Sequence, residues 1–488
     1  MSPEDIARRF EQRQGYDLVD YSQVALPIYR LTVDSVTMAH REIPPIKEFV
    51  MRSVAIGIDS ESKVAGFLGL DEATVHATFD QLCGDRHVSL SDSDDGSSAA
   101  LLDRGREVLA KARESSPQDE MLVFLFDRLM RKPVRLGAEQ LLAPANVDSQ
   151  QMIEIRSYPA DGPEIGDLSI SDVLQVLEQQ AGGRAAFGKD LLRLKRIVRR
   201  VRLYRPAIGL VYKKHRSSDI QIAFIVDDAR HEGLEHAFAV HGGPKKMGFL
   251  RSIDESSTTA ELRRYLGPEV QKLLPDTEEL TSKRLAVSLA RIKHQVCLGR
   301  VERRGGINAP EVAQEKEQLE AAFGILSEAE TQLRTFPARP VLPYEIAEHL
   351  SIALDACQSL LVISSRNLGR AVVDARFLKH VEAALQRNVR VVISITDPPC
   401  TDKPAIELER LRGRYPRLEL HSKRRAAFYH LICDDVFALV CNRPLLGNLG
   451  KLCTFHHVVG FLLQAPHLVS AFTNRVGADA GRPPGRDP

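Results

Sequence analysis

The feature that most constrains the fold is the regular alternation of helix-like and strand-like stretches after Pro343. Short apolar runs rich in valine and isoleucine are typical of buried strands, and here they alternate with longer segments of helical apolar spacing. The predicted order is helix Tyr344–Cys357, strand Ser359–Ser364, helix Val372–Gln386, strand Val389–Ile395, helix Ala405–Tyr415, strand Leu418–Leu420, strands Ala427–Cys433 and Val436–Cys441, and an apolar run Val458–Leu463. This alternation predicts an α/β domain.

The order of these elements resembles one half of the phospholipase D superfamily. The pieces that carry the resemblance are Leu361-Val-Ile-Ser-Ser365, the helix start Ala371–Leu378, the strand Arg390–Ile395 and the strand pair Leu431–Val440. The resemblance implies an H-x-K motif followed after four residues by an aspartate. In that chemistry the histidine attacks a phosphodiester and the lysine neutralises the phosphate oxygens.

The catalytic pair implied by the resemblance is missing from this sequence. When Asp434 is aligned with the aspartate of the motif, Ala427 falls where the histidine should be and Tyr429 where the lysine should be. Asn442 and Pro444 fall where the family usually has serine and asparagine. Alanine cannot act as a nucleophile. We therefore expect a phospholipase D-like pseudoenzyme domain that acts as a scaffold or dimerisation module.

A relocated histidine is the alternative. The candidate catalytic residues are His430, Asp434, His456 and His457. His430 follows Tyr429 directly, and successive strand residues point to opposite faces, so a regular strand would aim His430 away from the expected pocket. Under this alternative the protein is a dimeric phospholipase D-like nuclease or phosphodiesterase.

Cysteine usage argues against disulfides and against a metal site. The seven cysteines are scattered and form no C-x-x-C motif. Cys433, Cys441, Cys453 and His456 are residue types that bind zinc, but their spacing matches no structural zinc pattern. We predict no metal and no cofactor.

The N-terminal third resembles a winged helix-turn-helix. Its predicted elements are a helix from Pro44 to Ile56, helices Glu61–Leu68 and Glu72–Cys83, wing strands His87–Ser91 and Ala99–Leu102, and a closing helix Arg104–Ala112. The second helix of the motif, Glu72–Cys83, contains no lysine or arginine, and the predicted wing tip carries Asp92, Asp94 and Asp95. Such charges repel phosphates. We favour protein contact or spacing for this module, and a transcription regulator is a second alternative.

The central part of the chain carries a concentrated basic block. The formal net charge is −13 over residues 1–183 and +11 over residues 184–216. Apolar residues at helical spacing predict an amphipathic basic helix that runs into the strand Ala207–Lys213, followed by a hairpin turn and the return strand Ile220–Val226. We expect DNA or RNA to bind the cations of this block: Lys189, Arg193, Lys195, Arg196, Arg199, Arg200, Arg202, Arg205, Lys213, Lys214 and Arg216.

Length and composition set the remaining expectations. The chain has 488 residues, of which 43% are apolar and 27% charged, and no run is long and apolar enough to span a membrane. We expect a cytoplasmic multidomain α/β protein without a membrane partner. The predicted parts are an N-terminal extension (1–40), a winged helix-turn-helix (41–120), an α+β domain with the basic block (121–265), a helical connector (266–338), a phospholipase D-like domain (339–475) and a disordered tail (476–488). Two further helices are expected at Glu120–Arg131 and Ser171–Gln180.

A phospholipase D-like half also predicts self-association. A complete site of this family is built from two halves that face each other across a two-fold axis, and this chain shows one. We expect a homodimer through Tyr344–Phe472, with the glutamate-rich helix Ala309–Thr335 extending the contact.

Overall fold

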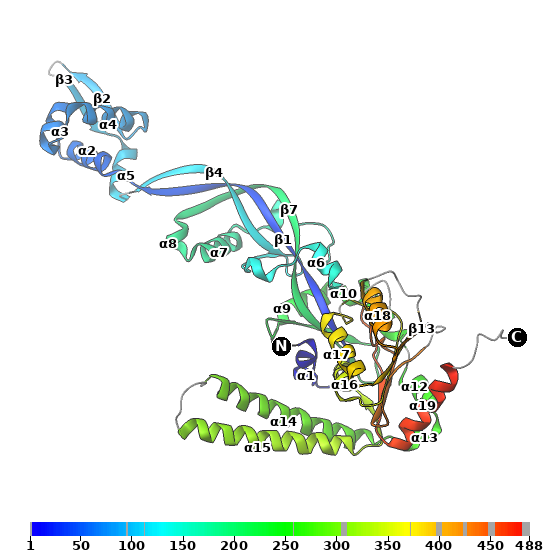
Figure 1. The fold of residues 1–488 in the computed structure, drawn as a ribbon. Coiled ribbons are helices and arrows are strands. Elements are labelled where there is room, and N and C mark those ends of the chain that lie inside the picture. The colour runs from blue at the N-terminus through cyan, green and yellow to red at the C-terminus, as the bar shows by residue number, and fades with distance from the viewer. Residues whose placement is uncertain are drawn as a thin grey trace. The chain divides into compact units, whose positions relative to one another are not determined.

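The computed structural model describes residues 2–93, 96–111, 113–256, 258–303, 310–370, 372–396, 403–422, 427–447 and 454–480 (Figure 1). The chain forms two compact units, each assembled from separate stretches. Unit 1 comprises Met1–Pro27, Glu139–Asp161 and Leu203–Pro488, and unit 2 comprises Ile28–Ala138 and Gly162–Arg202. Two long strands, β1 (Tyr16–Glu42) and β7 (Lys189–Lys214), contribute residues to both units. The finer division into six segments stays a prediction.

The C-terminal part of unit 1 is a seven-stranded sheet flanked by helices, as the sequence predicts. Its elements are β10 (Ala338–Val341), α16 (Pro343–Ala356), β11 (Leu360–Ser365), α17 (Ala375–Gln386), β12 (Arg390–Ile395), α18 (Lys403–Arg414), β13 (Leu418–Ser422), β14 (Tyr429–Cys433), β15 (Phe437–Cys441), β16 (Gly460–Leu463) and α19 (Pro466–Ala480). The strand order is β10-β16-β15-β14-β11-β12-β13. Strands β11, β12 and β13 are parallel, and the other neighbours are antiparallel. The predicted mixed α/β class is confirmed.

Alternating residues of this sheet enter two separate cores. On one face, Tyr429 and Leu431 of β14 pack with the apolar sides of α16, α17 and α18. On the other face, Ile432 packs with Phe472 of α19 and with α12 (Thr259–Leu266). Every second strand residue therefore meets a different layer of helices, which explains the near-continuous apolar strands in the sequence.

The rest of unit 1 combines parts of the chain that are distant in sequence. Its elements are α1 (Pro3–Arg9), α6 (Pro144–Ser149), β6 (Ile153–Glu154), β8 (Ile220–Val226), β9 (Ala229–Arg230), α9 (Glu232–Val240), α10 (Gly243–Lys246), α11 (Phe249–Asp254), α13 (Pro268–Lys272), α14 (Thr277–Arg303) and α15 (Pro310–Arg334). A shared core joins Ile6 of α1, Leu18 of β1, Leu210 of β7 and Ile225 of β8 to Tyr344 of α16. The N-terminal residues are therefore an integral part of unit 1.

Helices α14 and α15 lie side by side as a two-helix hairpin (Figure 1). Their shared seam is apolar and contains Leu280, Val287 and Ala290 of α14 with Leu326 and Leu333 of α15. The segment predicted as a helical connector contains both helices, and its role as a connector stays a prediction.

In unit 2 a group of helices is inserted between two paired strands. Strands β1 and β4 (Arg113–Asp127) pair antiparallel from Ile28 opposite Asp127 to Glu42 opposite Arg113. The inserted elements are α2 (Pro45–Ala55), α3 (Glu61–Leu68), α4 (Glu72–Gly84), β2 (Val88–Ser93), β3 (Gly96–Leu101) and α5 (Asp103–Lys111). They occur where the sequence predicts them, and their identity as a winged helix-turn-helix stays a prediction. The unit also contains β5 (Lys132–Val134), α7 (Ile170–Ala181) and α8 (Arg184–Phe187).

Two expected helices are strands. The basic segment predicted as an amphipathic helix belongs to β7, and the segment predicted as helix Glu120–Arg131 overlaps β4. Ile197, Val198 and Val201 are β-branched and favour extended backbone, and the order of the sheet strands gives β7 two neighbours, β1 and β8. The hairpin turn after β7 and the return strand β8 are as predicted.

Two predicted segments also need correction at the chain ends. Residues 1–40, expected as an extension, contain α1 and most of β1. Helix α19 continues to Ala480, so residues 476–480 of the expected disordered tail are helical. The residues from 481 onward lie outside the described part of the chain.

Candidate functional site

The place where the resemblance implies a catalytic site is one end of the C-terminal sheet. Here β14 begins with Tyr429, which pairs with Cys441 at the end of β15, and Cys441 in turn pairs with Gly460 at the start of β16. Ala427 lies just before β14 and is exposed. The Tyr429 side chain is buried in the core beneath α16 and α17. Ala427 has no nucleophilic group, and neither residue carries a positive charge.

An aspartate from the N-terminal strand occupies this end of the sheet. The Asp20 carboxylate accepts hydrogen bonds from the backbone N–H of His456 at 2.8 Å and of Tyr21 at 2.8 Å. Arg443 Nη1 lies 3.3 Å from Asp20 Oδ1, and the Arg443 guanidinium carbon lies 5.3 Å from the centre of the Tyr21 ring. The backbone N–H of Val458 donates to the carbonyl of Val19 at 3.0 Å. These contacts hold β1 against the chain that leads into β16.

Burial shapes the charges of this group. Burial raises the pKa of Asp20 to about 6, although Arg443 and two backbone donors act in the opposite direction. Burial and the neighbouring Arg443 lower the pKa of His456 to about 4. At neutral pH the histidine is therefore uncharged, and the positive charge of Arg443 is balanced by Asp20 rather than free to bind a phosphate.

The neighbouring polar residues hold the backbone. The Asn442 amide donates to the carbonyl of His457 at 2.8 Å and accepts from the N–H of Val459 at 2.9 Å. The His457 N–H donates to Ser256 Oγ at 3.0 Å, and burial lowers the pKa of the His457 ring. His456 and His457 thus lie at the expected end of the sheet, where their backbone groups fix the local chain path.

The other two candidate catalytic residues lie elsewhere. His430 is on the opposite face of β14 from Tyr429, as predicted, with its ring 5.9 Å from that of Phe472 and its Nδ1 3.1 Å from Ser364 Oγ. Asp434 is at the far end of β14, where its carboxylate accepts hydrogen bonds from the backbone of Gln358, Ser359 and Leu360. Burial would raise the pKa of Asp434, but these donors outweigh it and lower the pKa. Asp434 therefore fixes the start of β11, and the four candidates do not form one site.

Comparisons with known proteins give likenesses at low similarity. No family model matches the chain, and no curated protein matches it. Solved structures similar to it include Nuc, a phospholipase D family member from Salmonella typhimurium, with 16% identity over 29% of this chain and 89% of that chain and a TM-score of 0.22. NucT from Helicobacter pylori shows 11% identity over 29% of this chain and 94% of that chain, with a TM-score of 0.24.

A third similar structure is TrmBL2, described as an archaeal chromatin protein with a novel mode of DNA binding. It shows 17% identity over 34% of this chain and 62% of that chain, with a TM-score of 0.22. At these TM-scores the likenesses establish neither family membership nor function, so both are argued from the residues of this chain.

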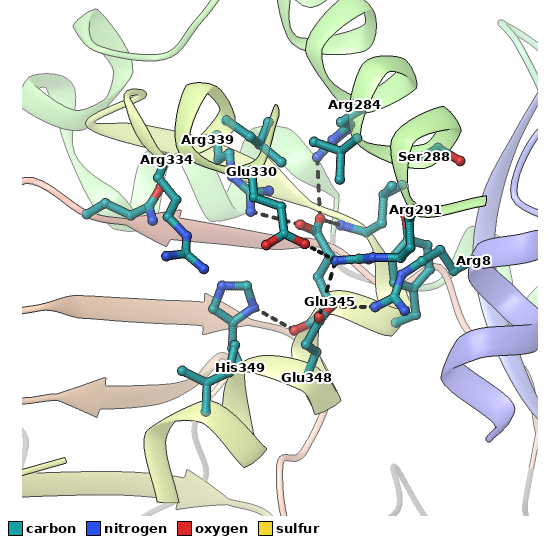
Figure 2. A pocket seen from close by; sticks show the side chains of 16 residues that line it. Arg8, Arg284, Ser288, Arg291, Glu330, Arg334, Arg339, Glu345, Glu348 and His349 are labelled. Carbon is teal, nitrogen blue, oxygen red and sulfur yellow. Dashed lines mark hydrogen bonds and ion pairs between the residues drawn. The ribbon is translucent and has the colours of Figure 1, made fainter. Parts of the chain in front are cut away.

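A second polar site, in unit 1, is a pocket at the base of the helical hairpin with a volume of about 100 Å³ (Figure 2). We call its charged residues the arginine–glutamate cluster. The cluster consists of Arg8, Arg284, Arg291, Arg339, Glu330, Glu345 and Glu348. These side chains come from α1, α14, β10, α15 and α16 and point toward one another. Sequence reasoning missed this site because its members are far apart along the chain.

Glu345 is the centre of the cluster. Its carboxylate lies 2.8 Å from Arg339 Nη2 and 3.8 Å from Arg284 Nη2, and it also accepts the backbone N–H of Leu342 at 2.7 Å. Burial would raise the pKa of Glu345, but Arg339 and Arg284 outweigh it and hold the pKa at about 2. Both Glu345 and Arg339 are buried, with 7% and 4% of their surface exposed. This pair is an internal ion pair.

The outer part of the cluster links the hairpin to the rest of unit 1. Arg8 Nη2 lies 2.6 Å from Glu348 Oε2, and Arg291 pairs with Glu330 and lies 3.8 Å from Glu348 Oε1. With each carboxylate matched by at least one guanidinium, the geometry supports a structural role that fixes the base of the hairpin.

The predicted nucleic-acid-binding cations are divided between the two units. In unit 1, Arg205 pairs with Asp227 at 2.6 Å and Lys213 with Asp254 at 3.3 Å. Lys214 is exposed at the end of β7, and Arg216 lies in the following turn. These cations are thus partly neutralised within unit 1.

In unit 2 the cations follow the first half of β7. Lys189 pairs with Glu120 at 2.7 Å and Lys195 with Asp119 at 2.6 Å, while Arg196 Nε is 3.4 Å from Asp34. Arg200 donates to the carbonyl of Pro163. The exposed Arg193, Arg199 and Arg202 have no carboxylate partner among the described residues. Unit 2 therefore presents cations whose charge is not balanced locally.

One face of the sheet in unit 2 lacks a covering helix among the residues described. Helix α7 covers the opposite face, where Val173 and Leu177 pack on Leu31 and Phe124. On the open face Met121 and Val123 of β4 are 54% and 49% exposed, as is Val198 of β7 at 50%. The unpaired arginines thus belong to a strand next to an accessible sheet surface.

Helix α4 contains no lysine or arginine that could bind a phosphate. The exposed His76 of α4 has its Nδ1 2.9 Å from Glu61 Oε2. This neighbour raises the pKa of His76. The Thr74 hydroxyl donates to Asp71, the residue that caps the helix. The charges of α4 agree with the predicted preference against phosphate contact.

The described part of the chain has neither a cluster of metal ligands nor a helix that could cross a membrane. No group of three histidine, cysteine, aspartate or glutamate side chains there is arranged to hold a metal ion. Among the same residues, no helix combines the length and apolar character that a membrane crossing requires. The described cysteines Cys83, Cys297, Cys357, Cys433 and Cys441 are unpaired by disulfides, and Cys400 and Cys453 lie outside the described residues.

Proposed function

We propose that the protein binds nucleic acid without hydrolysing it, using the cationic first half of β7 in unit 2, while its phospholipase D-like part serves as a scaffold. The observation that carries the proposal is the set of three exposed arginines, Arg193, Arg199 and Arg202, for which the described part of the chain offers no carboxylate partner. Unpaired guanidinium groups are well suited to phosphate oxygens because they donate several hydrogen bonds in a fixed fork.

The strand setting of these arginines fits an extended polyanion. Residues along a strand are spaced about 3.3 Å apart with side chains on alternating faces, and antiparallel β-ribbons are known to enter DNA grooves. Cations distributed along such a strand bind the phosphate backbone with little sequence preference. The proposed ligand is therefore a nucleic acid recognised mainly through its phosphates, with base recognition by α4 disfavoured by the charges of that helix.

The test is a charge reversal in the full chain. The variant R193E/R199E/R202E should lose most of its affinity for a mixed-sequence duplex, measured by fluorescence anisotropy at several salt concentrations. Each lost phosphate contact should reduce the slope of log K against log salt by about 0.9, so three contacts should reduce it by roughly 2.7.

A matched control separates local contacts from net charge. The variant R410E/R412E/R414E reverses three exposed arginines of α18, which have their own carboxylate neighbours in unit 1. It changes the net charge by the same amount and should retain most of the binding. Equal losses in the two variants, or full retention by the β7 variant, would contradict the proposed surface.

The non-hydrolytic part of the proposal rests on Ala427 and Tyr429. The purified protein should not cleave an activated phosphodiester, DNA or RNA, with or without Mg²⁺. The control is a set of alanine variants at His430, His456 and His457. Hydrolysis by the wild type that disappears in one of these variants would support the alternative of a nuclease with a relocated histidine.

A further inference from the structure

Helix α14 has two apolar faces, and only one of them is covered by its own hairpin. The covered face contains Leu280, Val287 and Ala290, which pack on α15. The second face contains Leu285, Leu289, Ile292 and Val296, which are 39%, 59%, 46% and 48% exposed. We call these four residues the open stripe. At about 100° per residue, the open stripe lies on roughly the opposite side of α14 from the seam with α15.

The spacing of the open stripe is that of a coiled-coil seam. Its members are separated by four, three and four residues, which is the a and d pattern of a heptad repeat. The arginine–glutamate cluster uses a different side of α14, through Arg284 and Arg291. Three sides of the helix therefore have separate roles: contact with α15, ion pairs at the base, and an apolar stripe that no described residue covers.

We propose that the open stripe is a homodimer interface in which α14 packs antiparallel against α14 of a second copy. The proposal is independent of nucleic-acid binding, because it rests on α14 alone. An antiparallel pair with its two-fold axis between Ala290 and Arg291 places Leu285 opposite Val296 and Leu289 opposite Ile292 of the second copy. The stripe is thus complementary to itself, which is the condition for a two-fold interface.

Charge complementarity supports the same register. In this register Arg300 of the second copy lies opposite Thr281. Thr281 is within one helical turn of Glu278, so Arg300 comes close to the Glu278 carboxylate. Glu278, Thr281 and Arg300 are all exposed. Lys293 would lie opposite Ser288 rather than opposite another cation. The antiparallel register therefore pairs unlike charges at each end and avoids repulsion beside the stripe.

This interface differs from the surface expected from the sequence. The homodimer expected from the sequence uses Tyr344–Phe472, which includes the segment around His456. In this chain, Asp20 and Phe249 of unit 1 contact that segment, the former through the His456 N–H and the latter through the ring of Phe455 at 5.0 Å. The open stripe remains the apolar surface with self-complementary spacing.

The experiment is a measurement of mass by light scattering over roughly a hundredfold range of protein concentration. The wild-type full chain should approach twice the 54.3 kDa of one copy at the upper end. The variant L289E/I292E should stay at the mass of one copy throughout. The control variant I406E/V436E places the same charges at apolar positions that are 45% and 61% exposed on other parts of unit 1, and it should dimerise like the wild type.

A second pair of variants keeps the proposal testable if the stripe variant folds poorly. E278R and R300E should each weaken the dimer roughly two- to fivefold, as expected for an exposed ion pair, and the double variant E278R/R300E should recover the loss. A wild-type mass of one copy at every concentration would overturn the proposal. So would a dissociation constant that L289E/I292E leaves unchanged, because the dimer would then use another surface.

Discussion

Two groups of arginines in this protein have opposite environments. In unit 1, Arg284 and Arg339 are directed into the base of the helical hairpin and share the buried carboxylate of Glu345. In unit 2, Arg193 and Arg199 extend from β7 into solvent without a carboxylate neighbour among the described residues. The same side chain therefore serves internal structure in one unit and is available for an external anion in the other.

The difference follows from the energetics of charge burial. Removing a guanidinium from water costs several kcal/mol, which a matched carboxylate must offset, so buried arginines occur with partners. An exposed arginine keeps its hydration and needs no partner, and a local ion pair would contribute little. An unpaired exposed cation is consequently the better indicator of a ligand, whereas a buried pair indicates a structural contact.

The largest effect should come from breaking the buried pair. Glu345→Ala should lower the free energy of unfolding by about 3–5 kcal/mol, because it leaves Arg339 buried without its partner. Urea denaturation followed by circular dichroism measures this loss. Replacing both members, as in R339M/E345L, should restore part of the stability, since Arg339 then no longer leaves an unpaired charge and only the more exposed Arg284 loses its partner. A loss below about 1 kcal/mol in Glu345→Ala would show that the cluster is not structural.

A smaller, pH-dependent effect is expected at Asp20, a buried acid that pairs with Arg443. Its pKa is raised from 3.8 to about 6, so the folded chain binds this proton more tightly than the unfolded chain does. The associated stability is fully present below pH 3.8 and is lost as the pH rises through about 6. Relative to Asp20→Asn, the wild type should gain up to roughly 3 kcal/mol as the pH falls from 7 to 4. Parallel unfolding curves for the two proteins at every pH would refute this.

The smallest effect should come from the exposed arginines. R193E/R199E/R202E should change the free energy of unfolding by no more than about 0.5 kcal/mol, because surface substitutions away from packed features rarely cost more. Thermal or urea denaturation of the same sample used for binding measures this. A large loss of stability would show that these arginines are structural, and the comparison between the two units would fail.

Much of the C-terminal fold could be predicted from the sequence. Strands such as β11 and β12 are short apolar runs bounded by polar residues, and α17 has a clear helical period, so local pattern alone identifies them. The residue types at positions 427 and 429, alanine and tyrosine, could also be read directly, as could the orientation of His430 away from Tyr429. Each of these conclusions depends on a few neighbouring residues.

The long strands of unit 2 show where local pattern was insufficient. The apolar residues of β7 fit a helical period, and those of β4 form a nearly continuous run, so periodicity alone does not separate helix from strand. In the structure Leu122 and Phe124 are buried while Met121 and Val123 are exposed, which is the alternation of a half-buried strand. The β-branched residues Ile197, Val198 and Val201 were the signal that favoured a strand for β7.

The sequence by itself determined the alternating helices and strands and the strongly basic segment, because each of these is a property of residues close together in the chain. Only the tertiary structure decided which charges meet. Asp20 and Arg443 are 423 positions apart, and Glu345 is 61 positions from Arg284. Charge pairs depend on distances of a few ångströms, and the folded backbone, rather than the order of residues, sets those distances.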